Sequence, residues 1–332
     1  WGVPIGLETW ADSYGKLNGG NRTGRGPGPE SPGHDAAPRV MPAPRIGPAT
    51  APLRNDPDPV TIHDGKRHEA EYQPQTSPIF HGPPTLNQVR QGYIADCYLV
   101  ASLGAIARTR PDILEQNIVD HQDGTATVTM YTVGRNVVTP GTPGARKSEI
   151  RVSTALPSVN KATPTYASSS EGALWPSIYE KAYAIHMAGG KYQGLNTGGH
   201  AGNAMETLTG SRSTGFTTKS RSDDQLVSDL RLALSQDKPV VAGSLSKDDA
   251  KADPQLNQLA TDRTVFPWHA YVVESVTDDG RINLYNPWGK RHPQPLTPAE
   301  FKRLYNNIYI NNPAAATQMA SASTPTTPTS NA

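Results

Sequence analysis

Glycine and proline are distributed unevenly along this chain, and their distribution limits where a folded core can form. The chain has 332 residues with 30 glycines and 31 prolines, and many of these lie before residue 75. In runs such as RGPGP at residues 25–29, the chain is interrupted every few residues. Such a segment has too few apolar anchors to offset the conformational entropy lost on folding. We therefore predict that residues 1–74 form a largely irregular arm or linker.

The C-terminal end has a similarly open composition. Residues 313–332 consist mostly of Ala, Ser, Thr and Pro and carry no charged side chain, which is typical of a flexible tail. The ordered part is then expected at about residues 75–312, which is long enough for one large domain. Because the chain begins at Trp1 and both ends resemble linkers, we expect a monomeric module of a longer protein.

The charge balance and the hydropathy argue against two kinds of partner. Lys and Arg total 31 and Asp and Glu total 30, so the formal net charge of +1 gives no general basic surface for nucleic acid or membrane lipids. No stretch approaches the roughly 18 continuous apolar residues of a spanning helix, and the start does not resemble a signal peptide. We expect a soluble protein without nucleic-acid or membrane partners. Its localisation stays unknown, with the bacterial cytoplasm and secretion both open.

Cys97 is the single cysteine of the chain. An internal disulfide and a thiolate-rich zinc site are therefore both excluded, and no metal or other cofactor is predicted. A lone cysteine is more often inert and buried than reactive, so its neighbours must decide. Apolar residues recur with helical spacing over residues 97–108, and Asp96 precedes them as the expected N-cap, which predicts a helix that begins at Cys97.

A thiol at the N-terminus of a helix is well placed to act as a nucleophile. The helix dipole and a nearby histidine both favour the thiolate, which is the form that attacks a carbonyl. Gln91 lies six residues before Cys97, close enough to direct its amide at the same carbonyl oxygen. The Gln91 side chain and the Cys97 backbone N–H are thus predicted to form an oxyanion hole.

The base must come from another part of the chain, because nucleophile and base converge in space rather than in sequence. His269 opens a predicted strand, and Asn286 ends the next strand across a hairpin turn at residues 278–280. The Asn286 amide oxygen can then accept from one imidazole N–H and leave the other ring nitrogen to face the thiol. Trp288 is expected to shield this hydrogen bond from water.

The remaining periodicities predict an α+β fold. Helical spacing predicts helices at residues 172–187, 201–208 and 223–235. Alternating β-branched residues predict strands at 125–133, 137–139, 148–152, 240–244, 269–276, 281–286 and 308–311. This pattern indicates a helical first half and a β second half, with an active-site cleft between them. We interpret Glu180 and Lys181 as structural charges of their helix, and Gly198 and Gly199 as a wall of the substrate cleft.

Five pieces of the sequence occur in an order that resembles the calpain cysteine protease core. They are Gln91-Gly92 with Cys97, Leu174-Trp175-Pro176 with Glu180-Lys181-Ala182-Tyr183, Gly198-Gly199 with Glu206-x-Leu208-Thr209-Gly210, Trp268-His269-Ala270-Tyr271, and Asn286-Pro287-Trp288-Gly289. The resemblance spans roughly residues 77–312, and the joint occurrence of the five pieces makes it specific. It implies a papain-like fold, with the cysteine helix in a helical lobe at about 75–210. The His and Asn residues would lie in an antiparallel β lobe at about 211–312.

The resemblance also implies an activity and a set of site residues. The activity is that of a cysteine endopeptidase, or thiol protease, which hydrolyses peptide bonds of a protein or peptide substrate through an acyl-enzyme. Cys97, His269 and Asn286 match the catalytic triad of the family. Gln91 matches its oxyanion glutamine and Trp288 its shielding tryptophan. Trp268 is expected to border the substrate cleft together with the two glycines.

Two departures from the family pattern bear on activity. Where calpains usually have Gly-Asp-Cys-Trp, this chain has Ala95-Asp96-Cys97-Tyr98, which is expected to change efficiency or subsite shape and to keep the chemistry. No EF-hand loop occurs, so the sequence does not support the calcium dependence that the resemblance allows. The short linkers resemble bacterial members, and a bacterial effector or toxin is a candidate role by analogy.

Two alternative functions stay open at this stage. The same thiol and histidine can serve an acyltransferase or a deamidase. The chain can also be an inactive protease-like module that binds a partner, with Ala95 as the degrading change. Transamidation without chain cleavage would favour the first alternative, and alkylation of Cys97 no faster than that of free cysteine would favour the second.

Overall fold

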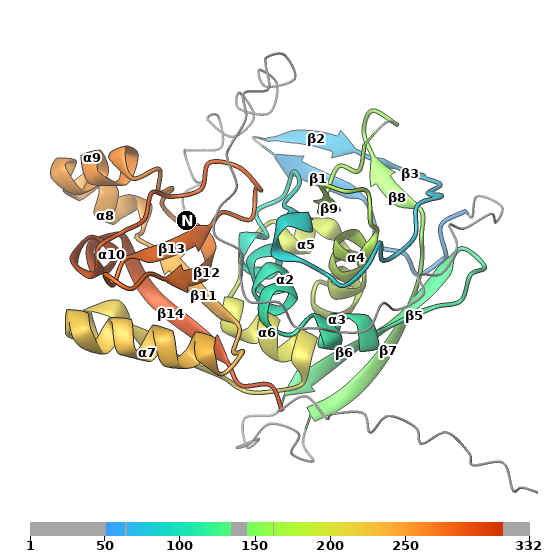
Figure 1. The fold of residues 1–332 in the computed structure, drawn as a ribbon. Helices are drawn as coiled ribbons and strands as arrows, with labels where there is room; N and C mark the ends of the chain where they lie inside the picture. The colour runs from blue at the N-terminus through green and yellow to red at the C-terminus, as the bar shows by residue number, and fades with distance from the viewer. Residues whose placement is uncertain (1–50, 64, 134–144, 162, 315–332) are drawn as a thin grey trace, which may run out of the picture.

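A computed structural model describes residues 51–63, 65–133, 145–161 and 163–314 of the chain. The first 50 residues of the predicted arm, the predicted strand at 137–139 and residues 315–332 of the predicted tail lie outside the described residues. We refer to the described residues up to 210 as the N-terminal region and to those from 211 as the C-terminal region (Figure 1). It mixes helices with antiparallel sheets, which confirms the predicted α+β class.

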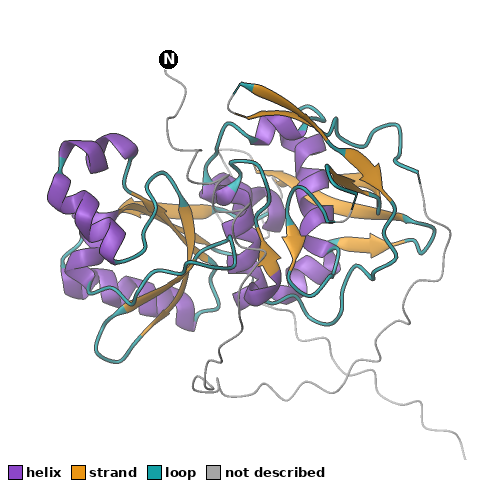
Figure 2. Cartoon of the chain, turned by 90° about the horizontal axis from the view of Figure 1, so that it is seen from above, coloured by secondary structure: helices purple, strands orange, loops and turns teal. Residues whose placement is uncertain are grey.

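The C-terminal region is built on a five-stranded antiparallel sheet in the order β10-β14-β11-β12-β13. Its strands are β10 (Ser213–Thr217), β11 (Val240–Ser244), β12 (Ala270–Val276), β13 (Ile282–Tyr285) and β14 (Tyr305–Asn311). Four helices pack on one face: α7 (Asp223–Ser235), α8 (Lys247–Ala252), α9 (Pro254–Asp262) and α10 (Pro298–Leu304). Figure 2 shows the sheet between these outer helices and the helices of the N-terminal region.

The N-terminal region gathers helices beside smaller sheets. The helices are α2 (Cys97–Thr109), α3 (Pro111–Gln116), α4 (Trp175–Met187), α5 (Tyr192–Leu195) and α6 (Ala201–Thr209). A three-stranded sheet contains β5 (Ile118–Asp120), β6 (Thr125–Val133) and β7 (Ala145–Ser153). Three two-stranded sheets pair β1 (Val60–His63) with β2 (Lys66–Glu69), β3 (Glu71–Gln73) with β8 (Leu156–Ser158), and β4 (Val89–Arg90) with β9 (Ser168–Ser169).

The helix α2 is the central element of the molecule. Residues 98–107 are all buried, because the helix is apolar on every side rather than on one stripe. Gly104 allows a close approach to the sheet, since a Cβ there would meet Leu86 Cδ1 at 2.9 Å and Val272 Cγ2 at 3.2 Å. The cysteine helix of the N-terminal region therefore rests directly on β12 of the C-terminal region.

The alternation of side chains along β12 joins the two hydrophobic cores. Ala270 and Val272 point into the core that surrounds α2. Tyr271 and Val273 point into the other core, with the helices α7 to α10. This alternation is the normal consequence of strand geometry, so β12 packs against one hydrophobic core on each of its two faces. The start of β12 is thereby fixed relative to the start of α2.

Two parts of the sequence-based layout are corrected by the structure. The division into a helical first half and a β second half is wrong in detail, because the C-terminal region also contains α8, α9 and α10. These helices are short and bury few residues, so each offers few apolar positions from which to predict it. In the described part of the predicted arm, residues 60–63, 66–69 and 71–73 form β1 to β3 rather than irregular chain, and Tyr72 pairs with Pro157 of β8. No helix of the described residues is long and apolar enough to cross a membrane.

Candidate active site

Cys97 is the first residue of α2 and is half-buried. Its sulfur lies near the Ala270 backbone N–H, at the first residue of β12. Burial raises the pKa of the Cys97 thiol to about 12, and the neighbouring Asp96 charge adds to that rise. The thiol is therefore protonated at neutral pH in the resting site, which corrects the expectation that the helix start and the histidine favour the thiolate there.

Asp96 occupies the N-cap position of α2, as predicted, but its side chain does not cap the helix. The Asp96 carbonyl accepts from the N–H groups of Leu99 and Val100, at 2.8 and 3.1 Å. The carboxyl group is fully buried and turns inward. The expectation of a capping carboxylate at this helix is thus corrected.

His269 and Asn286 meet across the β12–β13 hairpin. The distance between His269 Nε2 and Asn286 Oδ1 is 2.9 Å, and both residues are buried. Asn286 Nδ2 donates to the Arg291 carbonyl at 3.2 Å, which turns the amide oxygen toward the imidazole. Because that oxygen only accepts, we assign the proton of the neutral imidazole to Nε2, which leaves Nδ1 unprotonated.

The backbone of His269 is held by β11. The His269 N–H donates to Ser244 Oγ at 2.9 Å, and the Ser244 N–H donates to the His269 carbonyl at 2.9 Å. Burial lowers the pKa of His269 to about 4, although the hydrogen bond to Asn286 acts in the opposite direction. The imidazole is therefore neutral at neutral pH, like the thiol.

Trp288 covers the imidazole. The two rings have centroids 4.6 Å apart, and Phe266 packs at 4.6 Å on Trp288. The Trp288 backbone N–H donates to Asn286 Oδ1 at 3.1 Å. Removal of water from a hydrogen bond strengthens it, so this arrangement stabilises the His269–Asn286 contact.

Gln91 lies between the two regions. Its backbone N–H donates to the carbonyl of Pro287, the residue after Asn286, at 2.8 Å. Its side-chain Nε2 donates to the Ile94 carbonyl at 2.8 Å, and the side chain is buried. The next residue, Gly92, has no room for a side chain, because a Cβ would meet the Tyr166 backbone at 2.2 Å. Gln91 is thus anchored to the loop that carries Asn286.

The residues predicted to border the cleft lie at different depths. A Cβ at Gly199 would meet the Tyr98 ring at 2.4 Å, so only glycine fits beside the residue that follows Cys97. Gly198 has a φ of +77° and open space around it. Trp268 has 63% of its surface exposed and a φ of +55°, and Lys247 Nζ lies 5.9 Å from its ring centroid. The Trp268 ring, which directly precedes His269 in the sequence, is therefore accessible to a ligand.

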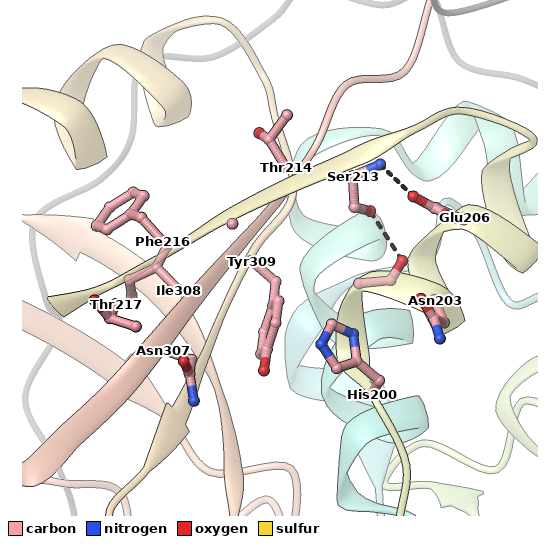
Figure 3. Close-up of a pocket in the computed structure, with 12 residues that line it drawn as sticks. His200, Asn203, Glu206, Ser213, Thr214, Phe216, Thr217, Asn307, Ile308 and Tyr309 are labelled. Atoms are coloured by element: carbon pink, nitrogen blue, oxygen red, sulfur yellow. Dashed lines mark hydrogen bonds between the residues drawn. The ribbon is translucent and has the colours of Figure 1, made fainter. Parts of the chain in front are cut away.

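A pocket of about 350 Å³ lies next to this glycine loop (Figure 3). His200, which follows Gly199, packs edge-on against Tyr309 with ring centroids 4.3 Å apart. The lining also includes the polar side chains of Asn203, Glu206, Ser213, Thr214, Thr217 and Asn307. Sequence reasoning missed this pocket, since its walls come from α6, β10 and β14, which are distant in the sequence. Only the Glu206-containing motif gave a signal for it.

Comparison of the sequence with known proteins identifies its family. The sequence model of the calpain family cysteine proteases matches residues 66–294, which is more than half of the chain. The chain therefore belongs to the calpain family of cysteine proteases. No curated protein matches it.

Proposed function

We propose that this chain is a cysteine endopeptidase with a papain-like two-lobe fold, in which Cys97, His269 and Asn286 form the catalytic triad. The observation that carries the proposal is the close packing of α2 on β12, which brings the Cys97 sulfur near the backbone of Ala270, the residue after His269. The 2.9 Å contact of His269 with Asn286 supplies the orientation that a general base needs. Family membership supports cysteine peptidase activity.

The proposed reaction starts from a neutral thiol and a neutral imidazole. As the Cys97 sulfur attacks the peptide carbonyl, its proton passes to His269 Nδ1 and the carbonyl oxygen becomes an oxyanion. The tetrahedral intermediate collapses, the C–N bond breaks, and the imidazolium gives its proton to the leaving amine. Water then attacks the thioester with His269 as the base, which releases the acid and restores the thiol.

Two donors are proposed to stabilise the oxyanion. One is the Cys97 backbone N–H at the open start of α2, where the helix has no intrahelical acceptor for it. The other is the Gln91 amide, whose Nε2 has two N–H groups and donates to the Ile94 carbonyl. Each donor is worth on the order of 3 kcal/mol of transition-state stabilisation.

The proposed substrate is an extended peptide that crosses the Gly198–Gly199 loop and Trp268. In the sheet, Gly243 pairs with Ala270 on one side and with Asn307 on the other. Neighbouring strands are about 4.8 Å apart, so Asn307 and its pocket lie about 10 Å from the start of β12. An extended peptide covers that distance in about three residues. We infer that the pocket receives a polar side chain two or three residues from the scissile bond.

The test compares the chain with three variants in cleavage of casein and of self-peptides. Cys97→Ala and His269→Ala are expected to abolish cleavage and to keep the fold, because each removes a reacting group. His121→Ala is the matched control, since His121 is exposed and far from the site in sequence. Wild-type cleavage is expected to persist with a calcium chelator. Cleavage by Cys97→Ala would refute the proposal, and transamidation of a glutamine substrate without cleavage would favour an acyltransferase.

A further inference from the structure

Two fully buried carboxyl groups lie beneath the nucleophile, and the proposed reaction does not use either of them. Asp96 precedes Cys97, and Glu180 lies in the middle of α4; both are completely shielded from solvent. The two carboxyl groups lie within hydrogen-bonding reach of each other. The Gln91 amide also lies beside Asp96. The cluster therefore connects the nucleophile and the proposed oxyanion glutamine with α4.

The hydrogen-bonding inventory of this cluster lacks a donor. Among the described residues, no group donates a well-formed hydrogen bond to either carboxyl oxygen of Asp96 or to Gln91 Oε1. Both Glu180 oxygens accept from a single group, the Ala167 N–H, at 3.0 Å. Buried acceptors without a donor cost about 1–3 kcal/mol each, so native structures avoid them. A proton on one of the two carboxyl groups would supply the donor, because a protonated carboxyl donates and an ionised one only accepts.

The charges around the cluster lead to the same conclusion. In the described part of the chain, no cation contributes to the pKa of either carboxyl. Lys181, the next residue of α4, binds Asp56 instead, with Nζ 3.0 Å from Oδ2. Two like charges that are buried side by side without a cation cannot both ionise at neutral pH.

The other titratable groups that face the pair do not compensate its charge. They are the Cys97 thiol and the hydroxyls of Tyr72, Tyr98, Tyr166, Tyr183 and Tyr192. Burial raises the pKa of every one of these groups, so all of them are neutral at neutral pH. Burial also raises the pKa of Asp96 to about 6 and that of Glu180 well above its ordinary value.

We propose that Asp96 and Glu180 hold one shared proton between their carboxyl groups, and that this bond positions Cys97 and Gln91 at the start of α2. The two are positioning residues, because neither touches the substrate in the proposed reaction. The shared proton also limits the negative charge next to the thiol, and that charge opposes formation of the thiolate. Only the importance of this effect for catalysis rests on the proposed function; the effect on the reactivity of Cys97 does not.

The test exploits the single cysteine, because iodoacetamide then reports on Cys97 alone. The rate of alkylation is measured against pH for the wild type, Asp96→Asn and Glu180→Gln. Each amide keeps the size of the side chain and offers an N–H donor, so both variants are expected to fold, as checked by circular dichroism. Glu149→Gln is the matched control, since Glu149 is an exposed carboxylate on β7.

The two amides should act in opposite directions. Asp96→Asn removes the charge beside the thiol and should lower the pKa of Cys97 by about one unit, which is about tenfold in alkylation rate near neutral pH. Glu180→Gln removes the shared proton, leaves Asp96 ionised and should slow alkylation. A merely structural pair predicts changes of the same sign in both variants. Equal rates in all variants, or shifts of the same sign, would overturn the proposal.

An infrared measurement gives a readout that does not need peptidase activity. The Cys97→Ala protein is expected to show the carbonyl band of a protonated carboxyl at neutral pH, and Glu180→Gln in the same background is expected to lose it. If the band is absent from the Cys97→Ala protein, the shared proton does not exist. If the band is present but the wild type cleaves no peptide, the proposed function fails and the shared proton stands.

Discussion

The two regions that form the candidate site hold their reactive side chains by different means. In the C-terminal region, His269 is held by neutral groups: the Asn286 amide, the Ser244 hydroxyl and a covering indole. In the N-terminal region, the elements behind Cys97 rest on buried ionisable groups, which are Asp96 with Glu180 and Lys181 with Asp56. Neutral contacts bring no charge that must be compensated, whereas buried charges cost free energy unless each is paired or neutralised. Single substitutions at these buried groups should therefore destabilise the N-terminal region more than comparable substitutions destabilise the C-terminal region.

The largest expected effect of this difference is a loss of stability when Lys181 is substituted. Its Nζ lies 3.0 Å from Asp56 Oδ2 and donates to the carbonyls of Ser153 and Ala155, at 3.0 and 2.8 Å. Lys181→Met would leave the Asp56 charge buried without a cation. The free energy of unfolding in urea is expected to fall by about 3–5 kcal/mol.

The matched control for this prediction is Lys147→Met on β7. Lys147 forms an ion pair of 2.8 Å with Glu149, but both side chains are more than half exposed. Removal of an exposed pair should change the free energy of unfolding by about 0.5 kcal/mol or less. Equal losses of unfolding free energy in the two variants would show that the buried charges of the N-terminal region do not make it sensitive to single substitutions.

The pH dependence of stability should separate the two regions by sign. The pKa of His269 falls from 6.5 to about 4, so the unfolded chain binds more protons between these values and His269 makes stability rise with pH. The pKa of Asp96 rises from 3.8 to about 6, so the folded chain binds more protons there and stability falls with pH. Each contribution is worth about 3 kcal/mol over the window, so these two should largely cancel. The raised pKa of Glu180 should then make the stability of the wild type fall as the pH rises.

Variants in the Cys97→Ala background allow the two opposite contributions to the pH dependence of stability to be measured separately. With His269→Ala, unfolding free energies between pH 4 and 6.5 should decline as the pH rises. With Asp96→Asn and Glu180→Gln together, which remove both carboxyl groups whose pKa burial raises, they should increase over the same range. Urea unfolding at a series of pH values measures both. Identical slopes in the two variants would contradict the assignment of opposite signs to the two regions.

The sequence predicted the elements around the site better than the contacts behind it. The helix at 97–108, the helix at 223–235 and the strand at 240–244 agree with α2, α7 and β11, because strong periodicity and clear turn residues mark them. The burial of Glu180 and Lys181 was not predicted. On α4, ten consecutive residues from Trp175 to Ala184 are buried, so no polar face indicates which charges lie inside. Their partners lie 84 and 125 positions away in the sequence, at Asp96 and Asp56.

Helix caps were a signal that went unused. Thr297 accepts from the Glu300 N–H and Glu300 accepts from the Thr297 N–H, which is a capping box at the start of α10. Ser246 forms the same motif with Asp249 at α8. Such motifs locate short helices whose apolar periodicity is too weak to detect. By contrast, the register of β10 on β14 depends on pairing across about 100 residues and could not be found from local pattern.

The smallest expected effect concerns the neutral hydrogen bond of the C-terminal region. Asn286→Ala removes the acceptor of His269 Nε2–H, and it also removes the acceptor of the Trp288 N–H at 3.1 Å. A buried donor left without a partner costs about 1–3 kcal/mol, so kcat/KM for a peptide substrate should fall by about one to two orders of magnitude. His269→Ala removes the proposed base itself and should reduce cleavage much further.

Asn286→Asp serves as the matched control, because it keeps an acceptor oxygen at the same position and adds a negative charge. It should retain more activity than Asn286→Ala at high pH, and it should raise the pKa of His269, since a carboxylate stabilises the imidazolium. The measurement is kcat/KM against pH for both variants. If kcat/KM of Asn286→Ala equals that of the wild type, the neutral contact with Asn286 does not orient the imidazole. The proposed difference between the two regions would then fail for the C-terminal region.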